Sequence, residues 1–326
     1  MRSRNAGKIC DRLWYLGREE SGIYLLEGDK CSLIISGGLS YLAPVVLSQL
    51  NAFGIDEKKI GKLLILHAHF DHVGLVPLFK RRNSEIDVYA SARAWEILNM
   101  PKGIETINAF SRLVADRMGL TGCLTGQDLE WRNDITGRVV SEGAEIDLGG
   151  ISVQILETPG HSSCSISAYV HEINALFPSD GGGIPYAEMI IPFGNSNFTQ
   201  YQESLEKLKP LKVDIFCADH YGYVTGREAE GYICRSIAAA RENRTQIEAL
   251  YRRTGSIDET VTELVEEVYR QQPDYLLSPE ICAGICRQTV RHIAGALEES
   301  ARGPRFTIKK YAEDYGCKPV SDHAKP

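Results

Sequence analysis

The stretch that most constrains the fold is residues 62–74, KLLILHAHFDHVG, in which an apolar run ends in histidines and an aspartate. Leu63 to Leu66 predicts a buried strand, because a continuous apolar run suits a strand that is covered on both faces. Four ligand-type side chains follow at the carboxyl end of this strand, where open α/β sheets keep their ligand sites: His67, His69, Asp71 and His72. Imidazole and carboxylate groups in this density indicate a first-row metal site.

The spacing of these residues suits two ions. Alternate residues of an extended segment face the same way, so His67 and His69 can bind one ion while Asp71 and His72, offset by the turn, face a second position. A histidine-rich surface turn is the simpler alternative. Four candidate ligands directly after a buried strand favour the metal site.

Further candidate ligands stand at similar junctions later in the chain. Each of the three lies just past an apolar run, namely 153–156, 175–177 and 213–217: His161, Asp180 and His220.

The ordered series His67-x-His69-x-Asp71-His72, Gly160-His161, Asp180 and His220 resembles the ligand series of the metallo-β-lactamase superfamily, over about residues 12–226. The resemblance implies that His67, His69 and His161 hold one metal and that Asp71, His72 and His220 hold the other. It also implies that Asp180 bridges them. The set is similar to that of the hydrolytic glyoxalase II and lactonase-like branches, whereas redox di-iron relatives replace the second histidine with a glutamate.

The predicted elements and the resemblance indicate an α/β (α+β) fold, a four-layer αβ/βα sandwich with a C-terminal helical extension. Two β-led halves are expected. The first has strands at 13–16, 22–27, 32–36 and 87–90 and helices at 41–53, 73–82 and 91–98. The second begins with strands 138–140 and 151–157 around a turn at 145–150, followed by a hairpin of 165–170 with 175–177.

We expect two units along the chain. Residues 1–226 form the sandwich, with a helical insertion at about 100–136 that either walls the substrate site or only pads the sandwich. Residues 227–326 form the extension, with helices at 228–252, 256–271 and 279–300 and an irregular tail ordered around Phe306 to Tyr311. The helices bury a face against the sandwich or a second subunit, so a homodimer through the extension stays open.

Composition excludes several classes of protein. The chain is 43% hydrophobic and 24% charged, which is ordinary for a globular protein. Its net charge of -7 does not show the excess of basic residues that is typical of proteins that bind nucleic acid. No apolar run is long enough to cross a membrane and no signal peptide is recognised, so a cytoplasmic location without membrane partners is expected. The nine cysteines are expected to be free thiols, with Cys282 and Cys286 on the core face of a helix.

The ligand set predicts a metal-dependent hydrolase that acts on a small molecule. Two divalent ions would generate a hydroxide from water at neutral pH, and Asp71 would orient that water or protonate the leaving group. Zinc is favoured, although iron and manganese suit the same ligands.

A thioester is the expected substrate. Lactonase relatives carry a tyrosine three residues after the bridging aspartate, where this chain has Gly183. The extension is similar to glyoxalase II-like thioesterases and, more weakly, to the quinolone-signal response thioesterase of pseudomonads. A lactonase or phosphodiesterase of the same fold is the alternative, as is a regulatory binding protein with a non-catalytic metal site.

The family's acidic residue after the third strand is replaced here by Ser36.

Overall fold

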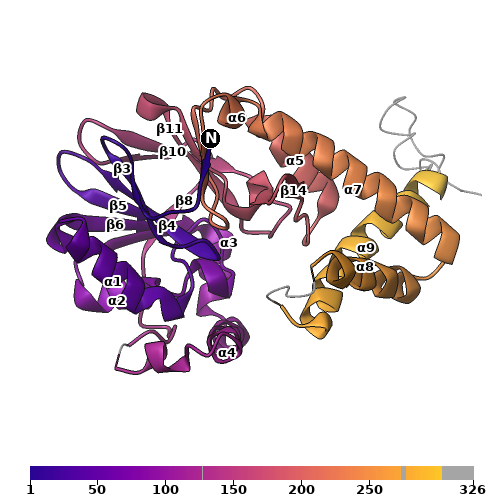
Figure 1. Cartoon of the computed structure of the whole chain (residues 1–326), viewed down its shortest axis with the longest axis horizontal. Coiled ribbons are helices and arrows are strands. Elements are labelled where there is room, and N and C mark those ends of the chain that lie inside the picture. The colour runs from indigo at the N-terminus through magenta and orange to yellow at the C-terminus, as the bar shows by residue number, and fades with distance from the viewer. Residues whose placement is uncertain (127, 273–276, 303–326) are drawn as a thin grey trace, which may run out of the picture.

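The computed structural model describes residues 1–126, 128–272 and 277–302, and the order expected around Phe306 to Tyr311 lies outside them. Two seven-stranded sheets form its centre (Figure 1). The first sheet has the order β2 (Gly7–Cys10), β3 (Leu13–Arg18), β4 (Ser21–Glu27), β5 (Ser32–Ile35), β6 (Ile60–Leu64), β7 (Asp87–Ser91) and β8 (Arg138–Val140). The second has the order β1 (Arg2–Ser3), β16 (Tyr223–Thr225), β15 (Ile215–Cys217), β12 (Ala175–Phe177), β11 (Ile166–Val170), β10 (Ser152–Glu157) and β9 (Glu145–Asp147).

Helices cover the outer face of each sheet, which confirms the predicted four-layer sandwich. Over the first sheet lie α1 (Ala43–Ala52), α2 (Val76–Arg82), α3 (Ala92–Asn99) and α4 (Pro101–Arg117). Over the second lie α5 (Phe198–Leu208), α6 (Arg227–Glu230) and α7 (Tyr232–Thr254).

The layering follows from strands whose residues are apolar on both sides. Side chains alternate between the two faces of a strand, so Leu33 and Ile35 of β5 enter the core between the sheets while Ile34 enters the core beneath the helices. Strand β6 and the residues after it divide in the same way, with Leu63 under the helices and Leu64 between the sheets. The run that leads to the candidate ligands is therefore buried on both faces and fixes their position.

Most predicted elements are present, but one pairing is wrong. The hairpin of β11 with β12 is confirmed. Strands β8 and β10 do not pair around a turn: β8 lies parallel to β7 in the first sheet, and the predicted turn contains β9, which pairs with β10. Three-residue strands give too few positions for periodicity to reveal which sheet they join.

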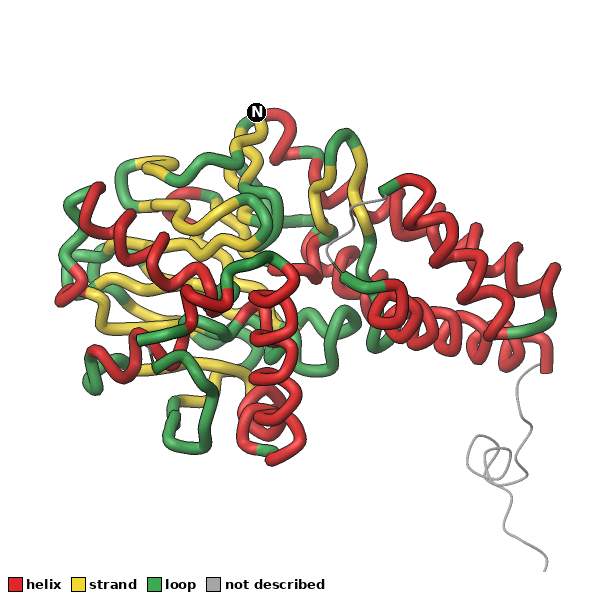
Figure 2. The backbone as a smooth tube through the Cα atoms, turned by 60° about the horizontal axis from the view of Figure 1, so that its bottom comes forward, coloured by secondary structure: helices red, strands yellow, loops and turns green. Residues whose placement is uncertain are grey.

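The predicted C-terminal helices form an arm beyond the second sheet (Figures 1 and 2). Helix α7 starts against the sheet and continues outward, and α8 (Ile257–Gln271) and α9 (Pro279–Arg302) pack on it and on each other. The arm buries apolar residues against the sandwich, among them Ile237, Ile247 and Ile293. Helix α5 and the hairpin of β13 (Ile184–Tyr186) with β14 (Met189–Ile191) pack against α7, and α5 also contacts the turn that follows β12.

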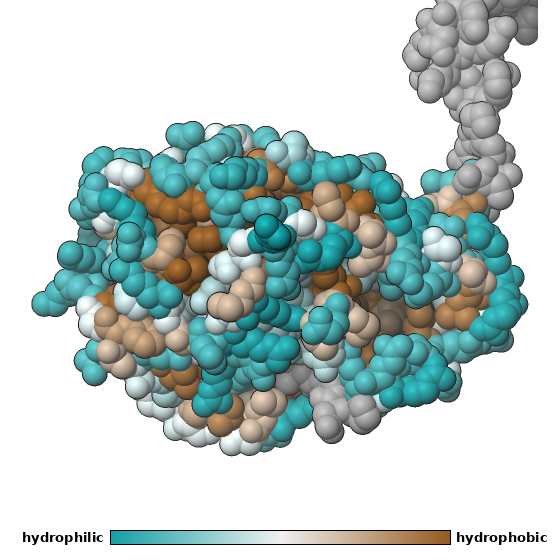
Figure 3. All heavy atoms as spheres, turned by 45° about the horizontal axis from the view of Figure 1, so that its top comes forward, coloured by the Kyte–Doolittle hydropathy of each residue, from teal (hydrophilic) through white to brown (hydrophobic). Residues whose placement is uncertain are grey.

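Within the described residues, no helix has both the length and the apolar character to cross a membrane. On the face shown in Figure 3, hydrophilic side chains predominate and the apolar residues form separate patches.

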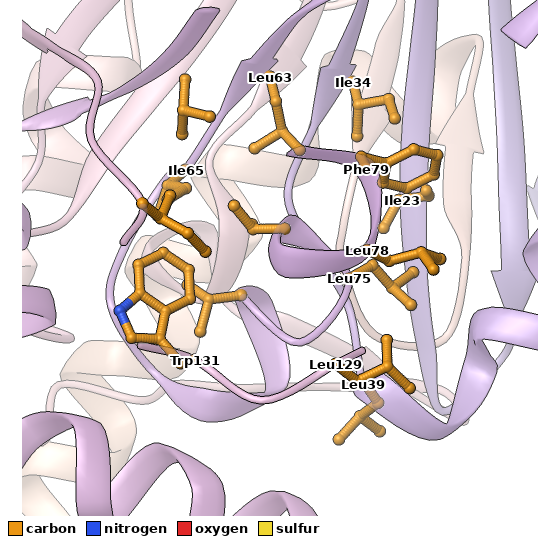
Figure 4. Packing of buried hydrophobic residues seen from close by; sticks show 14 of the residues in the cluster. Ile23, Ile34, Leu39, Leu63, Ile65, Leu75, Leu78, Phe79, Leu129 and Trp131 are labelled. Atoms are coloured by element: carbon orange, nitrogen blue, oxygen red, sulfur yellow. The ribbon is translucent and has the colours of Figure 1, made fainter. Parts of the chain in front are cut away.

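Trp131 fastens the insertion to the sandwich. Its side chain is 1% exposed and packs in the same cluster as Leu39, Ile65 and Leu129 (Figure 4). The indole Nε1 donates to the Leu98 carbonyl over 2.9 Å. The Asn108 side chain on α4 exchanges two 2.9 Å hydrogen bonds with the Trp131 backbone. The buried ring and these backbone hydrogen bonds therefore help to hold α4 against the sandwich.

Replacement of Trp131 by alanine is expected to lower the free energy of unfolding by about 3–5 kcal/mol, because it leaves a cavity in a packed core. Urea denaturation measures the change. The matched control is Arg132→Ala, whose exposed ion pairs with Asp128 are expected to contribute less than about 1 kcal/mol. Equal stability of the two variants would show that the ring does not anchor the insertion.

Candidate metal centre

All seven candidate ligands lie in segments that follow strands, and they meet at one edge of the sandwich. His67 and His69 follow β6, and Asp71 and His72 lie in the short helical turn Phe70–His72. The second sheet contributes the others: His161 after β10, Asp180 in the turn Ser179–Gly182 after β12, and His220 after β15.

Glycines let two loops touch beneath the histidines. The Gly37 amide donates to the His72 carbonyl over 2.7 Å, and the Gly74 amide donates to the Gly38 carbonyl over 2.8 Å. A Cβ atom on Gly37 would lie 2.7 Å from the His72 oxygen, and one on Gly74 would lie 2.3 Å from the Ser40 nitrogen. Both positions exclude a side chain, so the loop after β5 supports the turn that carries Asp71 and His72.

The candidate ligands form three overlapping groups, and within each group the donor atoms lie within 4.8 Å of one another. The groups are His67, His69 and His161; His67, His72 and Asp180; and Asp71, His72 and His220. The first and third match the two triads expected from the sequence. Asp180 lies between them, with Oδ2 at 3.3 Å from His72 Nε2 and 3.4 Å from His161 Nε2, and Oδ1 at 3.5 Å from His220 Nε2.

Backbone carbonyls fix the orientation of two rings. His161 Nδ1 lies 2.8 Å from the Phe193 carbonyl, and His220 Nδ1 lies 2.6 Å from the Glu20 carbonyl. A carbonyl only accepts, so each Nδ1 carries a proton, and Nε2 is the atom of each ring that remains for a metal. Those Nε2 atoms point into the cluster, 3.0 Å from His69 Nδ1 and 3.3 Å from His72 Nε2 respectively.

Asp219 supplies the acidic group that Ser36 does not. Its side chain is 1% exposed, and its Oδ2 lies 2.8 Å from His72 Nδ1 and accepts from Ser36 Oγ at 3.0 Å and Ser179 Oγ at 2.5 Å. Ser179 Oγ in turn lies 3.2 Å from His67 Nδ1. Sequence reasoning missed this residue, although its place between the end of β15 and His220 was a usable signal.

Burial and neighbouring charges shift the pKa values of the histidines in the two triads differently. Burial lowers the pKa of His67 and His161, and it lowers the pKa of His69 to about 4. Burial opposes charge on His72 and His220 as well, but Asp180 and Asp71 outweigh it and raise the pKa of both rings, that of His220 to about 9. The first triad is therefore neutral at pH 7, whereas the rings of the second are paired with the carboxylates of Asp71 and Asp180.

The donor set fits divalent cations. His67 Nε2 and Asp180 Oδ1 are buried and have no hydrogen-bond partner in the described part of the chain. Unpaired buried acceptors are costly, and facing imidazole nitrogens repel one another unless a cation or proton lies between them. Neutral imidazoles and ionised carboxylates are the forms that coordinate zinc, iron or manganese.

Three tyrosines that follow Asp180 or His220 closely in the sequence are placed differently. Tyr186 and Tyr221 line the cavity above the candidate ligands, with ring centroids 5.1 Å apart. Tyr223 instead packs against Tyr15, 5.8 Å away, beside the core between the sheets. Gly183 has a φ of +86°, and a Cβ atom there would meet Ile190 at 2.7 Å, so this backbone leaves no room for the lactonase tyrosine.

A cavity of about 650 Å³ opens above the candidate ligands. Its lining includes His69, Asp71, Asp180 and His220 together with residues of α3, α4, α9 and the β13–β14 hairpin. The insertion and the extension therefore both contribute walls, whereas the sequence left open whether the insertion only pads the sandwich.

Comparison with known proteins agrees with this geometry. ST1585, a metallo-beta-lactamase fold-containing protein of Sulfurisphaera tokodaii, is 25% identical over 220 residues, which cover 66% of this chain and 78% of that protein. The hydroxyacylglutathione hydrolase of Methylococcus capsulatus is 32% identical over 164 residues, 49% of this chain and 60% of that enzyme. The crystal structure of a metallo-beta-lactamase family protein from Thermus thermophilus, TTHA1429, has the same fold, with a TM-score of 0.63 at 15% identity over 89% of this chain and 95% of that one. Residues 17–220 match the model of the metallo-beta-lactamase superfamily, and the chain belongs to that superfamily.

Proposed function

We propose that this protein is a metal-dependent hydrolase that cleaves thioesters. The observation that carries the proposal is the convergence of seven imidazole and carboxylate side chains on the floor of a cavity large enough for a small molecule. We assign His67, His69 and His161 to one divalent ion and Asp71, His72 and His220 to a second, with Asp180 shared between them. Zinc fits these ligands best, and iron or manganese would also be accommodated.

When bound, the ions supply Lewis acidity, which lowers the pKa of water and stabilises negative charge on a carbonyl oxygen. The protein itself contributes by fixing the positions of the histidine rings. Phe193 and Glu20 hold His161 and His220 through their backbone carbonyls, and Asp219 holds His72. Fixed ligands do not have to reorganise as charge develops in the reaction.

Asp71 is the group we assign to proton transfer. It lines the cavity, and its Oδ2 lies 3.5 Å from His220 Nε2 and 3.6 Å from His72 Nε2. Burial opposes ionisation of Asp71, but the charge on His72 outweighs burial and keeps its pKa below the ordinary value. In the proposed reaction water attacks the carbonyl carbon, the C–S bond breaks, and the proton of water passes through the Asp71 carboxylate to the departing sulfur.

Two observations support a thioester over a lactone. The likeness to a hydroxyacylglutathione hydrolase is one, since that enzyme is named for a thioester reaction. The conformation of Gly183 is the other, because a tyrosine three residues after Asp180 has no space.

Asp180→Ala is expected to lower metal occupancy at both positions, because the replaced carboxylate faces both triads. Elemental analysis after dialysis against a weak chelator measures it. Asp71→Ala is the matched control, since Asp71 belongs to one triad and its loss should empty one position only. Full retention of one ion by Asp180→Ala would contradict a shared ligand.

Asp219→Asn is expected to weaken metal binding by about 10–100-fold, because a second-layer carboxylate that orients a ligand histidine usually contributes that much. Competition with a chromophoric chelator gives the affinity. Asp147→Asn removes the same charge from an exposed ion pair with Lys30 and should leave the affinity unchanged. Equal affinities in the two variants would leave Asp219 without a role at the centre.

The metal-loaded protein is expected to hydrolyse thioesters in preference to lactones and phosphodiesters. His69→Ala and His161→Ala should each lower kcat/KM by about a hundredfold or more, since each removes a ligand. Cys164→Ser should keep most of the activity, because the thiol is 3% exposed, accepts from the Ala68 amide and contacts the Ser162 hydroxyl. Preference for a lactone or phosphodiester would change the substrate class. No cleavage of any of the three would favour a regulatory binding protein.

A further inference from the structure

The cavity above the metal centre has a polar floor and apolar walls. The floor consists of candidate ligands, and the remaining charged side chains of the described lining are Glu20, Arg93 and Lys102. Its volume of about 650 Å³ lies within the range of sites that enclose small organic molecules.

The first wall is joined to the ligand loop itself. Phe70 lies between the candidate ligands His69 and Asp71 and stacks on Phe110 of α4, with ring centroids 5.4 Å apart and planes at 24°. Ile107, one turn earlier on α4, is 4% exposed and lines the same cavity. Apolar surface therefore starts directly beside the reacting centre and continues along the insertion.

The opposite wall comes from the extension. Ile281 and Ile285 are four residues apart on α9, so they lie on the same face of the helix, and both line the cavity. Ile184 and Ile191, cross-strand partners in the β13–β14 hairpin, line the same cavity. Each wall includes large apolar side chains that are only half-buried, and an apolar ligand in the cavity would cover them further.

We infer that the walls formed by α4, α9 and the β13–β14 hairpin bind an apolar acyl group, so that the substrate is a thioester of a hydrophobic carboxylic acid. This inference rests on the proposed function. A thioester carbonyl at the metal floor places its acyl substituent against Phe70, Phe110 and Ile285. A short or hydroxylated acyl group would leave these side chains in contact with water and gain little from them.

The experiment compares acetyl, hexanoyl and decanoyl thioesters of N-acetylcysteamine with the metal-loaded, full-length protein. Transfer of each methylene group from water to an apolar pocket favours binding by about fourfold, so kcat/KM should rise steeply with chain length until the cavity is filled. Phe110→Ala and Ile285→Ala should lose about tenfold or more on the decanoyl ester relative to the acetyl ester. Leu113→Ala is the control, because Leu113 lies on α4 but is 50% exposed and outside the cavity lining.

A second readout does not depend on turnover. Calorimetric titration with decanoate and with acetate should show tighter binding of decanoate to the wild-type protein, with a negative heat-capacity change, and loss of that difference in Ile285→Ala. A flat chain-length profile with no preference for decanoate overturns the inference while the hydrolase function stands. Selective decanoate binding without cleavage of any thioester overturns the hydrolase function and leaves an apolar ligand site.

Discussion

The meeting of imidazoles and carboxylates at the shared edge of two sheets is the constraint on which the rest of the structure depends. Four of these side chains come from the segment after β6, and three come from separate strand ends of the second sheet. Their donor atoms approach within a few ångströms only if the sheets pack in one relative position. The core between the sheets, which includes Leu33, Leu64 and Phe177, sets that position.

The sequence was informative where the relevant signal was local. The dense histidine motif after an apolar run predicted the first four candidate ligands, and short apolar runs joined by turn residues predicted β4, β5 and the β11–β12 hairpin. His161, Asp180 and His220 are isolated in the sequence, and the family resemblance was needed to group them. The structure brings all seven together.

What could not be predicted depends on contacts between distant segments. Strand β8 joins the first sheet because its backbone pairs with β7. Three residues are too few to show a periodicity from which this pairing could be predicted. The contact of Asp219 with Ser36 spans 183 positions. The stacking of Phe70 on Phe110 likewise decides that the insertion walls the cavity, since an amphipathic helix pattern alone is equally consistent with padding.

The hydrogen bond between Ser36 and Asp219 joins the two sheets directly beneath His72. The serine hydroxyl after β5 and the carboxylate after β15 meet at 3.0 Å and share the task of holding His72. A change in either sheet at this point would therefore reach His72, because the serine hydroxyl holds the carboxylate that in turn orients the ring.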